Sequence, residues 1–322
     1  MSEKSHIAWT DSTVNFWEGC TKVSPGCLNC YAEARDRRHM IEPVDHWGPG
    51  APRRKSKSAI KDALRMNKLP WICAACGEAF NGRQLKCRGL KCPTCGGEIH
   101  RRRIFSLSLG DWLDEEVPIE WLAEMLDTIR QCDQVTWILC SKRWENFFDR
   151  LKKASPKMPM SGPKIVFANW INSWVAGEAP ANIIGLCSVE DKEMTDKRIL
   201  QFLGVPMACH GLSMEPLLGP VEFNEDDDGY LRGWHIQPTM PDGEPQQVRN
   251  LSKVDWIIVG CESGLKRRFQ DGYEVAARSL ILQGQSAGVA VFHKQMPRYD
   301  KVSTNPAEWP SEFQAREWPK GF

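Results

Sequence analysis

Short apolar runs alternate with longer amphipathic segments through most of this chain. The runs lie at 13–18, 104–109, 135–140, 183–187, 206–212, 256–259 and 289–293. The segments between them predict helices at 119–132, 143–153, 192–202 and 272–287. In the first of these, Leu122, Met125, Leu126 and Ile129 recur with a helical period. This alternation predicts an α/β fold of the parallel β/α kind, a partial or full TIM-like barrel.

Three stretches depart from that alternation. Residues 71–100 are rich in cysteine and glycine, and residues 156–180 and 224–250 are predicted to be loop insertions, the second with an acidic run at 225–228. We therefore expect a barrel formed by 1–70 and 104–322, with the N-terminal part carrying a cysteine loop. An inserted module would occupy 71–103.

Polar side chains follow strand after strand at the point where each predicted strand ends. In β/α barrels, functional groups gather at this edge. The serines and aspartates among them also suit ordinary helix N-caps. Capping does not explain three glutamates and three cations on one expected rim. The glutamates and cations are Glu190, Glu215, Glu262, Lys142, Arg143 and Lys294, and the serines and aspartate at the same strand ends include Ser108, Asp111 and Ser188.

Three cysteines in one short loop, Cys20, Cys27 and Cys30, have the spacing C-x6-C-x2-C. A four-iron cluster held by three thiolates keeps one iron without a protein ligand, and that iron can bind a small molecule. Zinc is the alternative, with Asp36 or His39 as a fourth ligand.

Four further cysteines form two C-x2-C pairs, each followed by glycine. Such knuckles predict a closed, structural zinc ribbon held by Cys73, Cys76, Cys92 and Cys95. Metal binding would then fold a segment too short to form a core alone. A second iron–sulfur cluster is the rival interpretation, and Cys87 has no assigned role.

Composition limits the classes of protein that remain. The chain is 42% hydrophobic, which suffices for a sizeable core. No apolar run approaches the roughly 20 residues that span a bilayer. The first residues lack the apolar stretch of a signal peptide. We therefore expect a cytoplasmic protein without a membrane partner, whose 13 cysteines are reduced and in part bind metal.

Charge is unevenly distributed although the net charge is only +1. Residues 1–110 hold 19 Lys/Arg against 10 Asp/Glu, whereas 111–322 hold 23 against 31. The basic runs at 35–38, 53–57 and 101–103 predict contacts to nucleic-acid phosphates. Solvated surface is the alternative. Trp17, Trp47 and Trp112 are candidates for stacking on a base or adenine, with core packing as the other interpretation.

Several motifs in a fixed order carry a family resemblance. They are Trp9–Asp11, the cysteine loop 19–33, Ser-Lys-Arg at 141–143, Ser-Val-Glu-Asp at 188–191, Ser-Met-Glu-Pro-Leu-Leu-Gly-Pro at 213–220, Val-Gly-Cys-Glu-Ser-Gly at 259–264 and His-Lys-Gln at 293–295. Together they resemble the phage-associated three-cysteine family of unknown function, which is classed as radical-SAM-like. The resemblance covers most of the chain outside the ribbon and the insertions.

The resemblance implies a [4Fe-4S] cluster on Cys20, Cys27 and Cys30, with S-adenosylmethionine bound beside it in a radical-SAM-type barrel. The sequence departs from the wider C-x3-C-x2-C pattern, and Cys261 stands where this family commonly has glycine. The implied enzyme uses a 5′-deoxyadenosyl radical to modify or repair nucleic acid or a nucleotide. It needs an electron donor such as flavodoxin or ferredoxin.

Strand-end position suggests individual roles around that cofactor. Catalytic or substrate roles fall to Glu215, Glu262 and Lys294. Cofactor binding falls to Ser108, Asp111, Lys142, Arg143, Ser188 and Glu190. The alternative function is a non-catalytic, metal-stabilised adaptor that binds nucleic acid or protein, with zinc on all seven clustered cysteines.

Overall fold

The computed structural model describes residues 4–38, 44–85, 91–157, 164–223, 234–236, 247–249, 253–264 and 266–322. The chain forms two compact units. The first comprises Met1–Thr21, Arg35–Ile184 and Phe322, and the second comprises Lys22–Ala34 and Gly185–Gly321. Helix α1 (Tyr31–Arg38) and strand β9 (Ile183–Ser188) each pass from one unit into the other.

Parallel strands form the sheet of the first unit. Strand β1 (Ser12–Thr13) pairs with β7 (Arg103–Ser106), and β7 pairs with β8 (Thr136–Ser141). The single strand expected at 13–18 is wrong, because the chain leaves β1 after two residues. It then forms β2 (Trp17–Glu18), which pairs antiparallel with β3 (Arg54–Lys55).

Helices α2 (Ala59–Lys68), α4 (Ile119–Gln131), α5 (Phe147–Ala154) and α6 (Lys164–Val175) pack in succession in the same unit. The prediction of a loop over 156–180 is therefore wrong, because α6 lies within that range. Phe167, Ile171 and Trp174 stand four and three residues apart, and all three are fully buried. This helical spacing of large apolar groups explains why the segment folds. Trp174 stacks on Trp112 at a centroid distance of 6.4 Å.

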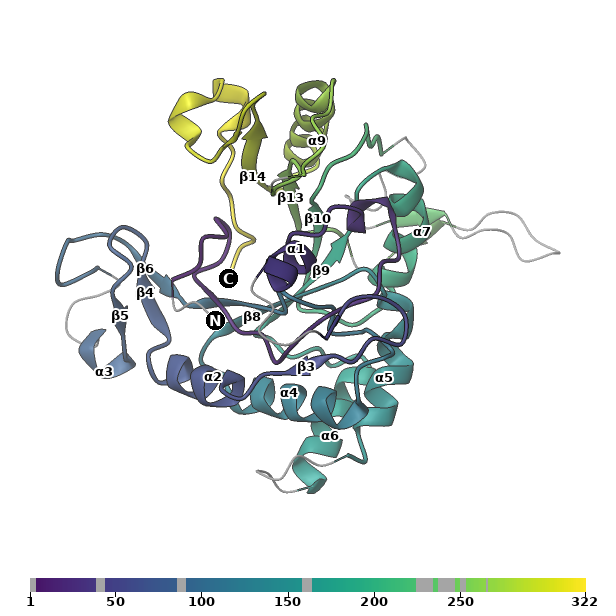
Figure 1. The fold of residues 1–322 in the computed structure, drawn as a ribbon. Helices are drawn as coiled ribbons and strands as arrows, with labels where there is room; N and C mark the ends of the chain where they lie inside the picture. Colours follow the sequence, from purple (N-terminus) through teal and green to yellow (C-terminus); the bar gives the residue numbers. More distant parts are fainter. Residues whose placement is uncertain are drawn as a thin grey trace. The chain divides into compact units, whose positions relative to one another are not determined.

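The cysteine-rich stretch folds as a small antiparallel sheet within the first unit (Figure 1). Strand β4 (Trp71–Cys73) lies between β5 (Ala79–Phe80) and β6 (Ile99–Arg101), and the short helix α3 (Gly82–Leu85) follows β5. Its core consists of Cys73, Phe80, Cys92 and Ile99, with Trp71 packed against them. So few apolar side chains make a weak core, as expected of a module that depends on metal.

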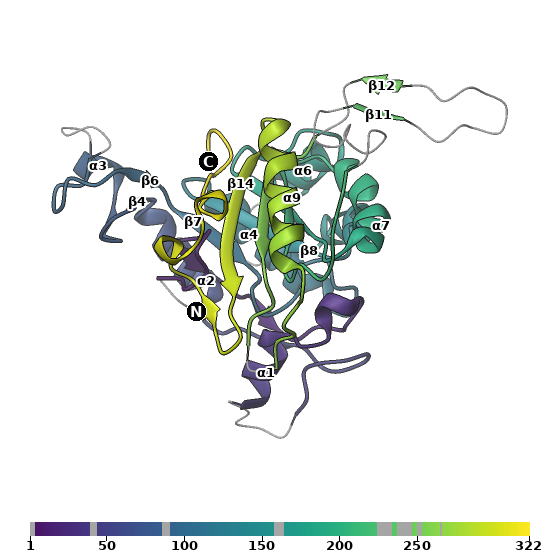
Figure 2. The same ribbon diagram turned by 90° about the horizontal axis from the view of Figure 1, so that it is seen from above.

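The second unit contains the strand order β9, β10 (Cys209–Met214), β13 (Trp256–Gly260), β14 (Ala290–Pro297) and β15 (Val302–Ser303). The pairs β10–β13 and β13–β14 are parallel, and β14–β15 is antiparallel. Helix α7 (Lys192–Leu203) follows β9, and α9 (Tyr273–Ser286) lies beside β14 (Figure 2). Within the insertion expected at 224–250, β11 (Trp234–Ile236) pairs antiparallel with β12 (Gln247–Arg249).

The mixed α/β architecture with mostly parallel strands is confirmed. All four expected helices are present as α4, α5, α7 and α9, each within a few residues of its expected ends. The radical-SAM-type barrel and the domain boundaries at 71 and 103 stay predictions. No helix in the described ranges is long and apolar enough to cross a membrane.

Candidate functional site

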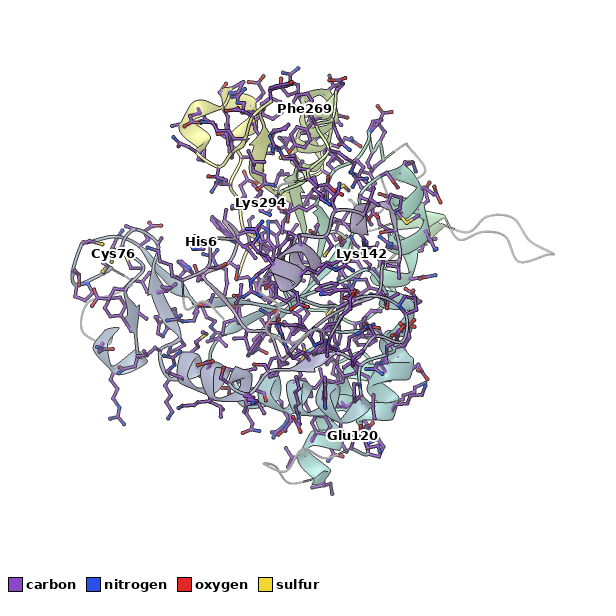
Figure 3. The ribbon with its side chains drawn as sticks, in the orientation of Figure 1. His6, Cys76, Glu120, Lys142, Phe269 and Lys294 are labelled. Atoms are coloured by element: carbon purple, nitrogen blue, oxygen red, sulfur yellow. The ribbon has the colours of Figure 1, made fainter. Side chains whose placement is uncertain are left out.

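The four ribbon cysteines converge on one point. Their sulfur atoms all lie within 4.8 Å of one another. Cys73 Sγ lies 3.5 Å from Cys95 Sγ, and Cys76 Sγ lies 3.7 Å from Cys92 Sγ. Zinc–sulfur bonds of about 2.3 Å place tetrahedral thiolates about 3.8 Å apart, so the spacing fits a four-coordinate metal. Cys76 is labelled in Figure 3. Cys87 lies outside the described residues.

Three glycines shape this metal site. Gly77 and Gly96 follow the two knuckles with φ angles of 74° and 73°, where L-residues are disfavoured. Each donates its backbone N–H to the carbonyl of the first cysteine of its pair at 2.9 Å. Gly97 is different, because a Cβ there would lie 3.0 Å from Cys73 Sγ and 3.3 Å from Cys95 Sγ. The site therefore needs a residue without a side chain at position 97.

Backbone N–H groups also donate hydrogen bonds to the ribbon sulfurs and so stabilise negative charge on them. Hydrogen bonds from the backbone of Cys76 and Ala75 lower the pKa of Cys73 to about 6, although burial opposes the shift. The neighbouring thiols raise the pKa of Cys76. One thiolate among four close sulfurs thus forms readily without metal, and a cation is required to hold all four as thiolates.

In the first unit, Cys20 lies against a buried arginine. Arg143 Nη1 is 3.5 Å from Cys20 Sγ and donates to Asp111 Oδ2 at 2.9 Å. Arg143 Nη2 donates to the Thr21 carbonyl at 2.6 Å. Burial raises the pKa of Cys20 to about 12, Arg143 lowers it, and Asp111 raises it. Cys20 is therefore a neutral thiol unless it binds a metal, which would deprotonate it.

Asp111 organises the end of β8. Its Oδ1 accepts from the Ser141 hydroxyl at 2.7 Å, and its Oδ2 accepts from the Lys142 backbone N–H at 3.0 Å. Burial lowers the pKa of Arg143, but the neighbouring carboxylates of Asp111 and Asp114 oppose this, and the net pKa is raised. Asp111 thus contacts both Lys142 and Arg143 within this unit, whereas the convergence of the three glutamates and three cations on one rim stays a prediction. Their contacts are to the protein itself, and a role in cofactor binding stays a prediction.

In the second unit, Glu190 holds the loop that carries Cys27 and Cys30. Glu190 Oε1 accepts from the backbone N–H of Gly26 at 3.0 Å, and its Oε2 accepts from Arg198 Nη1 at 2.9 Å. Glu190 is fully buried. A Cβ on Gly26 would lie 3.0 Å from the Glu190 carboxylate, so this glycine allows the close approach.

Glu262 holds the same loop from a different strand. Glu262 Oε2 accepts from Asn29 Nδ2 at 3.1 Å and from the Arg268 backbone N–H at 2.6 Å. Arg268 Nη2 donates to Glu262 Oε1 at 2.6 Å and to the Pro25 carbonyl at 3.2 Å. Burial raises the pKa of Glu262, but the Arg268 and Asn29 hydrogen bonds outweigh it, and the net pKa is lowered. We call Asn29, Glu262 and Arg268 the loop latch.

Cys30 itself receives hydrogen bonds from the start of α1. The backbone N–H groups of Glu33 and Ala32 point to its sulfur and lower its pKa, although burial raises it by more. Lys22 Nζ forms an ion pair with Glu33 Oε2 at 2.9 Å. Cys27 Sγ lies 3.7 Å from Ser24 Oγ. Hydrogen bonds to sulfur are one of the means by which proteins tune iron–sulfur clusters.

A second polar group in this unit joins β10, β13 and β14. Lys294 Nζ lies 2.8 Å from Glu215 Oε1, and both side chains are largely buried. A Cβ on Gly260 would lie 2.6 Å from Glu215 Oε1, so the glycine permits this position. Cys261 is buried, which raises its pKa to about 11. Three of the strand ends that were singled out in the sequence therefore meet here.

The two remaining predicted ligands have protein partners. Ser108 Oγ lies 3.1 Å from Asn15 Nδ2, and Asn15 Oδ1 accepts from the Leu109 N–H at 2.9 Å. Ser188 is buried, and its carbonyl accepts from Arg198 Nη1 at 2.9 Å. Cofactor contacts by these serines stay predictions.

The prediction that the basic runs contact phosphates is wrong for three of their arginines. Arg53, Arg102 and Arg103 are buried. Arg53 Nε donates to Asp114 Oδ2 at 2.9 Å, whereas Arg102 Nη1 donates to Ser12 Oγ. Arg103 forms an ion pair with Asp11 at 3.3 Å. Arg53 and Arg103 thus pair with acidic groups inside their own unit, whereas Arg102 binds neutral oxygen atoms.

The proposed stacking tryptophans are likewise part of the interior. Trp17 and Trp112 are fully buried, and Trp112 packs between Trp144 and Trp174. Trp47 is buried and donates its Nε1–H to Asp36 Oδ2 at 3.0 Å. Asp36 also contacts His46 Nδ1 at 3.1 Å. Asp36 is thus already engaged, and His39 lies outside the described residues.

Sequence reasoning did not single out Asn15, Arg198 or Arg268. Each supports a predicted residue through its side chain: Asn15 supports Ser108, Arg198 supports Glu190 and Arg268 supports Glu262. The two arginines follow the glutamates by eight and six residues. That proximity is the one signal the sequence offered.

The chain matches the family DUF5131, described as proteins of unknown function, over residues 4–320. The chain therefore belongs to this family. No curated protein and no solved structure matches it.

Proposed function

We propose that this protein is a radical S-adenosylmethionine enzyme that modifies or repairs nucleic acid or a nucleotide. The observation that carries the proposal is the set of buried side chains that hold the three-cysteine motif in place. Two glutamates from separate strand ends hold the loop bearing Cys27 and Cys30, and Arg143 contacts Cys20 Sγ. A loop that served only as a connection would not need two buried carboxylates to fix it.

The residues present fit an iron–sulfur cluster. Cys20 and Cys30 are partly buried thiols whose sulfurs have N–H donors nearby, from Arg143 and from the start of α1. Burial disfavours their free thiolates, so a metal is the partner that makes thiolates stable there. Cys20, Cys27 and Cys30 would hold the cluster. With S-adenosylmethionine, such a cluster supplies a carbon radical that removes hydrogen from an unreactive carbon.

The chain's own groups would position and shield the bound molecules. The Glu190 and Glu262 carboxylates hold the cysteine loop through Gly26 N–H and Asn29 Nδ2. Lys294 and Glu215 form an ion pair at the strand ends of the same unit, where a polar substrate or the methionine group of the cofactor would find both signs of charge. Lys142 and Arg143 both follow β8, and Arg143 provides positive charge beside Cys20.

The test is the metal content of anaerobically reconstituted protein. We expect a brown protein with about four irons and matching sulfide per chain beyond the ribbon metal. Cys27→Ala should abolish the colour and keep the ribbon metal. Cys132→Ala, at the end of α4, is the matched control and should leave both unchanged. The reduced wild-type protein should convert S-adenosylmethionine to 5′-deoxyadenosine.

A colourless wild-type protein that contains only zinc would overturn the proposal and favour a metal-stabilised adaptor. The four-sulfur ribbon site is compatible with either function. The resemblance to a phage-associated radical-SAM-like family supports the enzyme, as does the placement of acidic and basic groups at strand ends.

A further inference from the structure

Two exposed aromatic side chains lie together on the second unit. Phe269 follows β13 and is 52% exposed, and Tyr299 follows β14 and is 92% exposed. Their ring centroids are 6.5 Å apart, at an interplanar angle of 63°. Phe269 and Lys294 are both labelled in Figure 3. Two exposed aromatic rings in contact with one another offer a flat apolar surface to a binding partner.

An arginine ties the two aromatic loops together. Arg267 Nη2 donates to the backbone carbonyl of Arg298 at 3.0 Å and to that of Tyr299 at 3.1 Å. The hydrogen bonds fix the loop after β14 to the loop after β13, from the Arg267 side chain to two main-chain carbonyls. The rings are therefore held at a set spacing while their faces stay in solvent, as a preorganised binding surface requires.

The two loops that carry the rings are rich in Lys and Arg. Residues 266–271 and 298–301 contain five Lys/Arg and two aspartates. Arg268 is engaged by Glu262, and Arg298 Nη2 donates to the Glu308 carbonyl. Lys266 and Lys301 are exposed. We call Lys266, Phe269, Tyr299 and Lys301 the aromatic platform.

The platform is connected to the cysteine loop of the same unit. Arg268 lies next to Phe269 in the chain, and its Nη2 donates to the Pro25 carbonyl in that loop at 3.2 Å. Glu262 follows β13 and Lys294 lies within β14, and the two platform loops come after these strands. A molecule bound on the platform would therefore lie beside the loop that carries Cys27 and Cys30.

We infer that the aromatic platform binds a single-stranded nucleic acid. Unpaired bases stack on Phe269 and Tyr299, and the backbone phosphates contact Lys266 and Lys301. Exposed rings interleaved with cations are the combination that single-strand binders use, because every base has a π-face and every linkage a charge. A duplex keeps its bases stacked inside and offers them no such contact. The inference names the substrate class of the proposed enzyme and rests on that function.

Binding is measured by fluorescence anisotropy on the full-length, metal-reconstituted protein. The probes are labelled DNA and RNA single strands of about 12 nucleotides. The matching duplex is the competitor. We expect one or both of the labelled single strands to bind. The duplex should compete only weakly with them. Tyr299→Ala and Phe269→Ala should each weaken binding about 5-fold or more, because each removes a stacking face.

Conservative and distant variants separate stacking from folding. Tyr299→Phe keeps the ring and should bind within about 2-fold of wild type. Phe148→Ala removes an aromatic ring that is 37% exposed on α5 and should leave the affinity unchanged. In a salt titration, changing Lys266 and Lys301 together to Ala should reduce the slope of log K against log salt by about 1.4 if each contacts one phosphate.

The inference is overturned if no single strand binds, if the duplex binds better, or if the two alanine variants bind as wild type does. Iron content and S-adenosylmethionine cleavage are measured on the same preparations. If single strands do not bind but the cluster is intact and S-adenosylmethionine is cleaved, the aromatic platform is rejected and the proposed enzyme activity stands. If the protein contains no iron but binds single strands through the platform residues, the proposed enzyme activity is rejected and the binding inference stands.

Discussion

The side-chain amide of Asn29 donates to Glu262 Oε2 at 3.1 Å, across 233 residues of sequence. Asn29 lies between Cys27 and Cys30, whereas Glu262 follows β13. Glu262 is further fixed by Arg268, which reaches back to the Pro25 carbonyl. The position of the cysteine loop in its unit is thus set by a carboxylate and a guanidinium from the distant end of the chain.

Removing the amide of Asn29 should loosen that loop. A hydrogen bond to a charged group contributes about 1.5–3 kcal/mol, so Asn29→Ala should raise the open population of the loop about 10-fold or more. Hydrogen exchange of peptides covering residues 22–34 measures this. Asn172→Ala, on the exposed side of α6, is the matched control and should exchange as wild type does. Equal protection in both variants would show that the latch does not hold the loop.

The ribbon metal should depend on a glycine as well as on cysteines. Gly97→Ala places a methyl group 2.9 Å from Ala75 Cβ and 3.0 Å from Cys73 Sγ. We expect zinc affinity, measured by competition with a chelator, to fall about 10-fold or more. Gly82→Ala has open space around it and should retain the wild-type affinity. Unchanged affinity in Gly97→Ala would mean that the metal is not bound by these four sulfurs.

Cys76→Ser should remove one equivalent of metal and unfold the segment around β4, β5 and β6. Metal binding supplies folding free energy that the small core of Phe80, Ile99 and the two buried cysteines does not. Metal analysis together with limited proteolysis checks both parts. If iron disappears in place of zinc, the module holds an auxiliary cluster.

The buried arginine Arg53 should matter for stability far more than its exposed neighbour Lys57. The side chains of Arg53 and Asp114 are each 1% exposed and form an ion pair at 2.9 Å. Arg53→Ala leaves a buried carboxylate without this partner and should cost about 3–5 kcal/mol in urea unfolding. Lys57→Ala should change the unfolding free energy by less than about 0.5 kcal/mol. Similar small effects in both would place Arg53 at the surface.

Stability should fall on acidification in part because of His293. Burial lowers its pKa to about 4, although the Phe313 carbonyl, 2.8 Å from Nδ1, opposes the shift. In the unfolded chain the pKa is about 6.5, so the unfolded state binds a proton that the folded state excludes between these values. The unfolding free energy should decrease by about 3 kcal/mol as the pH falls from about 6.5 to 4.

Urea titrations at several pH values measure this dependence. His293→Gln should flatten it, whereas His6→Gln, at an exposed position, should not. Buried His210, whose pKa is also lowered by burial, contributes a residual slope in both variants. An unaltered pH dependence in His293→Gln would show that folding does not lower the pKa of His293.

The amino-acid sequence by itself determined the features that depend on local spacing. The four main helices follow from apolar residues at a 3.6-residue period. The ribbon site follows from two C-x2-C knuckles with glycine behind each, because the ligands of one knuckle are fixed within a few residues. The strand-end glutamates were also identified, because an acidic residue after a buried strand can be read without knowing what it contacts.

Only the tertiary structure decided what those side chains do. Basic runs at 53–57 and 101–103 gave no sign that Arg53, Arg102 and Arg103 are buried, since burial depends on elements brought in from elsewhere. Helix α6 was missed although its apolar residues have helical spacing, and the packing of its Trp174 against Trp112 and Phe147 appears only in the structure. The loop latch and the pairing of Phe269 with Tyr299 likewise join residues that are distant in sequence. Such contacts form when the chain folds, and no local pattern encodes them.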